Sequence, residues 1–571
     1  MKTLAQAQTD GVVAPLSTRP DSAGQTPATD TEWPEQSRSE RYIALAIFLL
    51  SFFYLCIFRR YSWVDPDEGI ILQGAQRIFD GQVLYRDFFS FFTPGSYYFF
   101  ALVFRAFGDS YLVAHTALAF IGAAFSPITY LLARRVCSRQ ASLLVTFLMT
   151  VTALPWRFVV IHNWDSTLWA CLALYCAVRL LERPSVPWAF AAATFTSLTA
   201  LFEQSKGAGL LLGLGAGFLI IIIFERPESK IFTRDRLMAI VVGLTWPFLV
   251  TLVYFASRHG LTTMLAGWFW PLQHYSLANR VPYAYDNMTG VARHRIFDSA
   301  SFGLRLFAML VFSARTWVPY LPLFGVALLI RLTFRRWRRA SLRPEWAYYV
   351  LVSATISGLL LSIVIGRADY LHFIFLQPIF FLVLAWVLDG RSIRNPFFSR
   401  IAPVVGLCLS MSLLAMAAKS LFVAPSDRSV ITRRGSITTQ GPGTVIEYVQ
   451  AHVAPGESIL IYPYQSTYYY LTQTYSPTRF DYFQPGMHTE EQLREMLADF
   501  SAHPTRVVLY EPTFKDHLRE AWPNTPPGAL GRDVLAEYIM REYHPCTTLG
   551  SEILFMMRSD LKCPNEERPS P

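Results

Sequence analysis

The most regular pattern in this chain is a succession of long apolar stretches separated by short polar loops. The first stretch, residues 42–58, contains no charged side chain and is long enough to cross a bilayer as a helix. Hydropathy and flanking charges predict about eleven such spans, so the fold class expected is an α-helical polytopic membrane protein. The spans lie near residues 42–60, 111–133, 140–156, 164–181, 188–203, 207–224, 237–256, 317–334, 345–365, 371–388 and 399–418.

Basic residues distinguish the two sides of the predicted membrane domain. They cluster in alternate short loops, at residues 134–139, 226–236, 335–343 and 391–400. Loops of this kind stay in the cytoplasm, so the N-terminus is predicted to be cytoplasmic and the outer loop 61–110 extracytoplasmic. The net charge of +9 is thus mainly a topology signal. It does not indicate nucleic-acid binding, because the basic clusters are short and lie directly beside the predicted spans.

Three regions follow from this pattern. Residues 1–41 are rich in Ser, Thr, Pro, Gln and Ala and predict a disordered cytoplasmic tail. Residues 42–420 form the membrane domain, and residues 421–571 predict a small extracytoplasmic α/β domain. Its apolar strands are expected at 458–463, 506–511 and 553–557, with a helix near 490–500. An oxidising compartment would allow a disulfide between its two cysteines, Cys546 and Cys563. The location expected is a cell membrane, as in the bacterial inner membrane.

An acidic cluster, Asp65-Pro66-Asp67-Glu68, follows the first span directly. Asp at the N-cap, Pro at the first helical position and Glu two residues later predict the start of a helix. This local role does not exclude function, because Asp67 in the first turn would remain free to face a ligand. Burying charged side chains in hydrocarbon costs free energy, so three carboxylates in four residues indicate a polar functional site at the outer membrane face.

A second helix is predicted after this one, with Thr93 as its N-cap and Gly108 at its end. Both helices are too short to span, and the first is amphipathic. They are therefore expected to lie in the membrane interface, where they would frame a polar, aromatic-rich pocket.

In four features the chain resembles the GT-C superfamily of glycosyltransferases. These features are a first span, an Asp-Glu pair at the start of the outer loop, two juxtamembrane helices and a Pro-Gly element. The most similar pattern is the family 39-like group, which includes protein O-mannosyltransferases and lipid A aminoarabinose transferase. The resemblance covers residues 42–420 in architecture and 61–108 in motif. It implies transfer of a sugar from a polyprenyl-phosphate donor at the outer face, with Asp67 of the Asp67-Glu68 pair in catalysis.

The chain departs from this pattern at the second helix. Aminoarabinose transferases carry Lys-Pro-Pro-Leu there, whereas this chain has Thr93-Pro94-Gly95-Ser96. Another cation must then meet the donor phosphate. Candidates at the outer ends of the spans are Arg367 and His372, which share a turn with Asp369, and Arg86, Arg157 and Lys206. The alternative for Arg367 is an ion pair with Asp369 and snorkelling to the lipid surface.

The function predicted is an inverting hexosyl- or pentosyltransferase acting on an acceptor hydroxyl of a lipid, glycan or protein. Asp67 would be the general base, with Glu68 and Asp65 beside it. A divalent cation held by Glu68 and Asp65 is left open, since three carboxylates alone do not require one. The alternatives are a flippase for polyprenyl-linked sugars and a non-catalytic envelope assembly protein. Transporters often show internal repeats and mid-bilayer charges, whereas the charges here lie at the membrane surface.

Overall fold

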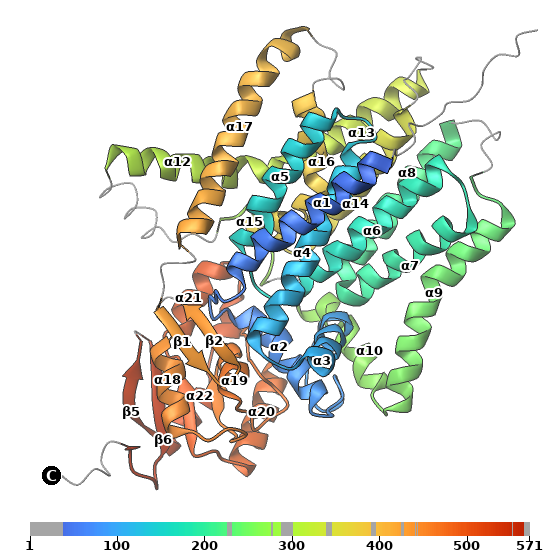
Figure 1. The fold of residues 1–571 in the computed structure, drawn as a ribbon. Helices are drawn as coiled ribbons and strands as arrows, with labels where there is room; N and C mark the ends of the chain where they lie inside the picture. Colours follow the sequence, from blue (N-terminus) through green and yellow to red (C-terminus); the bar gives the residue numbers. More distant parts are fainter. Residues whose placement is uncertain are drawn as a thin grey trace, which may run out of the picture. The chain divides into compact units, whose positions relative to one another are not determined.

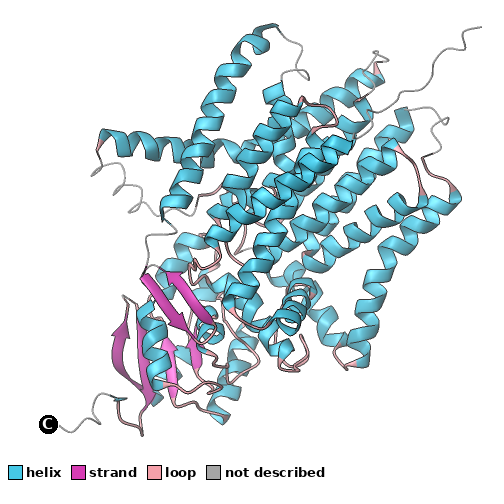
Figure 2. Cartoon of the chain, viewed as in Figure 1, coloured by secondary structure: helices cyan, strands magenta, loops and turns pink. Residues whose placement is uncertain are grey.

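The computed structural model describes residues 38–224, 231–275, 278–286, 301–338, 345–389, 396–423, 428–439, 441, 443–550 and 552–564. The predicted N-terminal tail up to residue 37 and the basic loop residues 226–230, 339–343 and 391–394 lie outside these ranges. Helices dominate the described residues, and the named strands all come after residue 427 (Figures 1 and 2).

The apolar stretches form long helices, as in a multi-pass membrane protein. Seven stretches of the described chain are long and apolar enough to cross a membrane, and α7 and α16 are shorter apolar helices. Each of the eleven predicted spans falls on helix, the eighth and tenth on two consecutive helices. The helices are α1 (Arg38–Leu55), α4 (Tyr111–Ala133), α5 (Arg139–Trp156), α6 (His162–Glu182), α7 (Val186–Phe202), α8 (Gln204–Phe224), α9 (Arg234–Ser257), α12 (Phe302–Trp317), α13 (Leu321–Trp337), α14 (Trp346–Ile365), α15 (Tyr370–Phe375), α16 (Gln377–Asp389) and α17 (Pro396–Val423).

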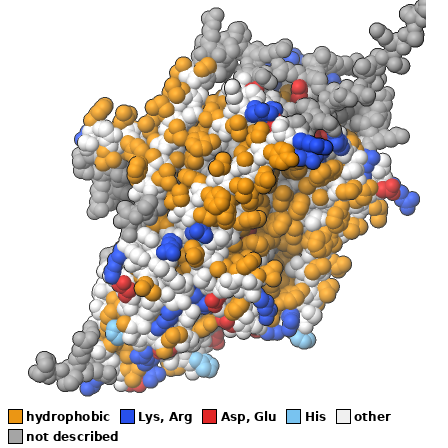
Figure 3. All heavy atoms as spheres, in the orientation of Figure 1, with side chains coloured by type: hydrophobic (Ala, Val, Ile, Leu, Met, Phe, Trp, Pro, Cys, Tyr) orange, Lys and Arg blue, Asp and Glu red, His pale blue; other side chains and the backbone are white. Residues whose placement is uncertain are grey.

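Small residues allow the membrane helices to approach closely. A Cβ atom added to Gly358 of α14 would lie 2.1 Å from the carbonyl oxygen of Gly209 in α8, so both helices need glycine at this crossing. Close backbone approach through small residues is a common way for helices to associate in lipid. On the face drawn in Figure 3, hydrophobic side chains form a broad band over the helices, and charged side chains gather toward its borders.

Three shorter helices, α2 (Pro66–Phe79), α3 (Gly95–Phe107) and α10 (Leu261–Trp270), lie toward the same end of the helical region as the strands (Figure 1). The predicted start of α2 is confirmed, because the Asp65 side chain accepts the Asp67 N–H. The predicted end of α3 at Gly108, which has φ +89°, is also confirmed. The expected N-cap of α3 is wrong by one residue. Pro94, which has no capping side chain, occupies that position instead of Thr93.

The α2 helix is buried by protein on nearly all sides, and its position in the membrane interface stays a prediction. The C-terminal region covers its polar face, where Arg77 pairs with Asp481 at 2.8 Å. At Gly69 the backbone of Thr467 comes so close that a Cβ would lie 2.1 Å from the Thr467 nitrogen. A contact of this kind between distant segments cannot be read from the amphipathic pattern of α2 itself.

The C-terminal region contains a hairpin of β1 and β2 and a four-stranded mixed sheet in the order β3-β4-β6-β5. Strands β3 and β4 are parallel, and the other neighbours are antiparallel. The three predicted strands and the predicted helix are confirmed as β3, β4, β6 and α20, whereas β5 and the hairpin were not predicted. The elements are β1 (Arg428–Thr432), β2 (Gly435–Thr439), α18 (Gly443–His452), β3 (Leu460–Tyr462), α19 (Thr467–Thr472), α20 (Glu490–Ala502), β4 (Val507–Tyr510), α21 (Phe514–Ala521), α22 (Val534–Glu542), β5 (Tyr543–Leu549) and β6 (Ile553–Arg558).

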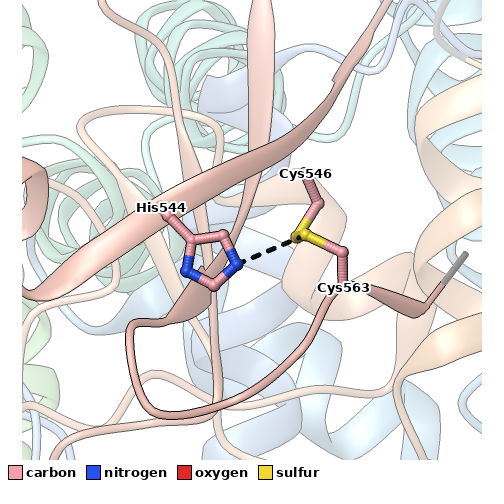
Figure 4. Close-up of side chains that lie close together, drawn as sticks. All are labelled: His544, Cys546 and Cys563. Atoms are coloured by element: carbon pink, nitrogen blue, oxygen red, sulfur yellow. Dashed lines mark hydrogen bonds between the residues drawn. A yellow bond between two sulfur atoms is a disulfide. The ribbon is translucent and has the colours of Figure 1, made fainter. Parts of the chain in front are cut away.

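A disulfide closes the end of this region, and its hairpin joins it to the segment that follows α1. A disulfide joins Cys546 in β5 to Cys563, with His544 Nε2 3.4 Å from the Cys563 sulfur (Figure 4). The hairpin extends onto the segment after the first span. There the Thr438 N–H donates to the Arg60 carbonyl at 2.7 Å, and the Ser62 N–H donates to the Thr438 carbonyl at 2.9 Å.

Candidate active site

A cavity of about 360 Å³ is lined by the start of α2, the turns that follow α5 and α14, and the C-terminal region. Segments from very different parts of the chain therefore meet around one space. The lining residues are Asp65, Pro66, Asp67, Ile70, Phe91, Phe92, Arg157, Ile161, His162, Asn163, Asn279, Arg367, Asp369, Leu371, His372, Phe375, Tyr464, Gln465, Gln484, Met487, Glu511, Phe514, Leu518, Ala521 and Trp522.

Asp67 presents its carboxylate to this cavity from the first turn of α2. Its side chain is 39% exposed. The Tyr464 hydroxyl donates to Oδ1 at 2.9 Å, and Arg157 Nη2 lies 3.5 Å from Oδ2. A partly exposed carboxylate with one oriented oxygen and a nearby cation is suited to accept a proton from a bound hydroxyl.

Asp65 has a different role, because both of its oxygens are engaged within the protein. Oδ1 accepts the Asp67 N–H at 3.0 Å, and Oδ2 pairs with Arg157 Nη2 at 2.7 Å. Burial raises the pKa of Asp65 to about 6, and the Arg157 guanidinium only partly opposes this rise. Asp65 thus caps α2 and holds Arg157 beside Asp67.

Glu68 is fully buried and is not part of the cavity wall. One oxygen lies 2.7 Å from His115 Nε2 and accepts the Val160 N–H at 2.8 Å, and the other accepts the Tyr111 hydroxyl at 3.0 Å. Through Val160 this carboxylate fixes the segment that carries Arg157. The structure does not direct the oxygens of Glu68 and Asp65 toward a common ligand.

Within the described ranges, the group of three metal-ligating side chains close enough to share an ion is His544, Cys546 and Cys563 (Figure 4). The two cysteines of that group are joined to each other by the disulfide.

Arg367 and His372 both line the cavity, and both interact with Asp369. Arg367 donates through Nε to Asp369 and through Nη2 to the Ala521 carbonyl at 2.5 Å, and His372 Nδ1 lies 2.6 Å from Asp369 Oδ1. Burial alone would raise the pKa of Asp369, but His372 and Arg367 outweigh it and hold the pKa well below its usual range. The expected Arg367–Asp369 pair is present, but Arg367 is only 6% exposed and does not snorkel.

The structure does not bring Arg86 or Lys206 to the cavity wall. Arg86 forms two 2.8 Å contacts with its neighbour Asp87 and donates to the Arg258 carbonyl at 3.1 Å. Lys206 is buried between α6 and α8, where it pairs with Glu203 at 2.8 Å and donates to the Asn163 carbonyl at 2.8 Å. Its location favours a role in fixing the start of α6.

A second, smaller cavity of about 190 Å³ adjoins the first, because Arg157 and Leu371 line both. It contains two cations that the sequence analysis missed, Arg315 of α12 and Lys419 of α17. Lys419 Nζ lies 4.2 Å from the centre of the Trp156 ring. A signal for Lys419 existed, since a lysine at the outer end of the last predicted span runs against the usual charge bias.

About a third of the residues that line the larger cavity belong to the C-terminal region, including Tyr464, Gln484, Glu511 and Trp522. Tyr464 lies in a segment, residues 462–470, that carries several tyrosines. The neighbouring tyrosines Tyr469 and Tyr470 are fully buried. No local pattern separates Tyr464 from them, because the difference arises from docking on α2.

Comparison with known proteins agrees with the fold. No protein-family model matches the chain, and no curated protein matches it in sequence. The structure is similar to ArnT from Cupriavidus metallidurans bound to undecaprenyl phosphate, with a TM-score of 0.53 and 11% identity, covering 91% of this chain and 98% of that one. It is also similar to the Archaeoglobus fulgidus oligosaccharyltransferase, with a TM-score of 0.51 and 12% identity, covering 89% of this chain and 72% of that one. These similarities concern the fold, and the predicted GT-C-like fold class is confirmed by them.

Proposed function

We propose that this protein is a membrane glycosyltransferase that moves a sugar from a polyprenyl-phosphate donor to an acceptor hydroxyl outside the cytoplasm, in the bacterial inner membrane. The observation that carries the proposal is the position of Asp67. Its carboxylate faces a sugar-sized cavity that adjoins, at Arg157, a second cavity lined by cations.

The cation-lined cavity is suited to the phosphate of the donor. Arg157, Arg315 and Lys419 bring three cationic side chains to a space bordered by the aromatic rings of Tyr61 and Trp156. Charge-assisted hydrogen bonds from such groups bind phosphate oxygens strongly. ArnT, whose fold is similar, was solved with undecaprenyl phosphate bound, which supports a donor of this class.

In the proposed reaction the acceptor oxygen attacks the anomeric carbon of the donor sugar while Asp67 takes the hydroxyl proton. The bond between the anomeric carbon and the phosphate oxygen breaks, and polyprenyl phosphate departs with the electron pair. A single displacement inverts the anomeric configuration. Arg157 and the neighbouring cations stabilise the negative charge on the leaving phosphate, while the Tyr464 hydroxyl orients Asp67.

A deletion strain and a reconstituted assay test this function. We expect a carrier-linked sugar to accumulate in the strain that lacks the protein. The purified protein in liposomes should convert this isolated lipid to free polyprenyl phosphate and a glycosylated acceptor, both measured by mass spectrometry. Movement of the intact lipid across the liposome membrane without release of polyprenyl phosphate would instead establish a flippase.

A further inference from the structure

Gln484 stands out among the residues of the main cavity because its carboxamide has no hydrogen-bond partner in the described part of the chain. The residue is fully buried and lines the cavity, yet neither its side-chain oxygen nor its nitrogen finds a hydrogen-bond partner among the described residues. Burying an amide without hydrogen bonds destabilises a folded protein, and such groups are rare. A group retained at this cost at a cavity wall indicates a ligand that completes its hydrogen bonds.

Hydrogen bonds hold the backbone around Gln484, so the Cα atom from which its side chain extends is fixed in position. Its N–H donates to His488 Nδ1 at 3.1 Å, and its carbonyl accepts the His488 N–H at 2.9 Å. The preceding residue, Phe483, donates to the Pro463 carbonyl at 2.7 Å. This turn therefore belongs to the packed C-terminal region that covers the cavity.

A second residue of the wall, His162, also carries a buried polar atom that no described residue bonds to. His162, the first residue of α6, is 9% exposed and lines the same cavity, and its Nδ1 finds no hydrogen-bond partner within the described part of the chain. The His162 ring rests against Phe92, with ring centres 4.3 Å apart. Both the membrane domain and the C-terminal region thus present unsatisfied polar groups to one space.

We propose that Gln484 recognises a sugar through two neighbouring hydroxyls, with the carboxamide oxygen accepting from one hydroxyl and the NH2 group donating to the other. A neutral group that is both donor and acceptor matches a pair of hydroxyls. A phosphate requires cations instead, and three of these, Arg157, Arg315 and Lys419, line the second cavity, where Gln484 is absent from the wall. The inference rests on the proposed function, since the sugar belongs either to the donor or to a glycan acceptor.

The substitution Gln484→Met separates recognition from structure, because it keeps the length of the side chain and removes both polar atoms. We expect the melting temperature of the detergent-solubilised protein to rise, since an unsatisfied buried group is lost. The KM for the sugar-bearing substrate should increase at least tenfold. A higher KM for the donor lipid assigns the hydroxyls to the donor, and a higher KM for the acceptor assigns them to the acceptor. Inhibition by undecaprenyl phosphate, which carries no sugar, should be unchanged.

Gln450→Met is the matched control. The Gln450 amide is fully partnered, because it accepts the Arg433 N–H at 2.7 Å and donates to the Ile431 carbonyl at 2.9 Å, and the residue does not line the cavity. This variant should have a lower melting temperature and an unchanged KM. Gln484→Asn, which withdraws the amide by one carbon, should raise the KM without the gain in stability.

The outcomes distinguish the two proposals. A wild-type protein that releases no polyprenyl phosphate from the accumulated donor would refute the proposed function and this inference together. An active wild type whose Gln484→Met and Gln484→Asn variants keep both KM values would refute only the inference. A loss of melting temperature in Gln484→Met like that of Gln450→Met, without a change in KM, would show that Gln484 is structural.

Discussion

Tyr464 donates its hydroxyl to Asp67 at 2.9 Å, across a separation of 397 positions in the chain. The Tyr464 ring is in turn held against Phe514 and Trp522, at 5.6 and 6.0 Å between ring centres. The C-terminal region therefore contributes directly to the environment of the candidate base. This contact makes the α/β region part of the site rather than a separate appendage, and it motivates the first two predictions.

Asp67→Asn should reduce sugar transfer about a hundredfold or more, because the amide keeps the shape of the side chain but cannot take a proton. The protein should still fold and bind undecaprenyl phosphate. Transfer rates and melting temperature measure the two effects. Asp80→Asn, at the other end of α2, is the control and should retain normal transfer. Equal losses in both variants would remove Asp67 from the chemistry.

Tyr464→Phe should lower kcat about tenfold while the KM for the donor changes little, since only a hydrogen bond to a charged group is lost. The chain offers a matched control in Tyr475, which donates to Asp80 at 2.7 Å and also joins the C-terminal region to α2. Steady-state kinetics of Tyr475→Phe should resemble those of the wild type. If Tyr464→Phe behaves in the same way, the hydroxyl does not orient Asp67.

Arg157→Ala should raise the KM for the donor about a hundredfold, because a forked cation beside the leaving phosphate is lost. Lys419→Met should have a smaller effect of about tenfold, and Arg157→Lys should restore activity only in part. Donor titrations measure these changes, with Arg86→Ala as the control outside the cavity. A larger defect in Arg86→Ala than in Arg157→Ala would relocate the phosphate site.

Asp65 should make stability depend on pH. Burial raises its pKa to about 6 from an ordinary value of 3.8, so the folded protein binds this proton more tightly than the unfolded chain. The stabilisation of the folded protein by this bound proton is fully present below pH 4 and is lost as the pH rises to about 6. The free energy of unfolding changes by about 3 kcal/mol over this range. Thermal unfolding between pH 4 and 7.5 should therefore show that the melting temperature of Asp65→Asn rises relative to that of the wild type as the pH increases. A constant difference would contradict this assignment.

The orientation in the membrane can be tested with alkaline phosphatase fusions. A fusion after Val423, at the end of α17, should be active because this end is predicted to lie outside the cytoplasm. A fusion after Arg338, at the C-terminal end of α13, should be inactive because the basic residues around it are held inside. The reverse pattern would place Asp67 in the cytoplasm and overturn the proposed donor.

The residues that sequence reasoning located best are those defined by local rules. The cap by Asp65 and the end of α3 at Gly108 depend on interactions within a few residues, and both are present. Arg157 was one of five cation candidates, among which Arg367 stood first, and the structure separates them. Arg157 borders both cavities, Arg367 and His372 line only the larger one, and Arg86 and Lys206 are engaged elsewhere.

The sequence by itself determined the membrane class, the positions of the spans and the acidic helix start, because hydrophobic length and helix capping act over short stretches of chain. Only the tertiary structure decided which polar side chains meet. The docking of the C-terminal region on α2 buries Arg77 against Asp481 and brings Tyr464 to Asp67. It also places the buried amide of Gln484 at the cavity wall, where no described residue bonds to it. The contacts of Arg77 with Asp481 and of Tyr464 with Asp67 join residues hundreds of positions apart. The local pattern of hydrophobic and polar residues therefore cannot predict them.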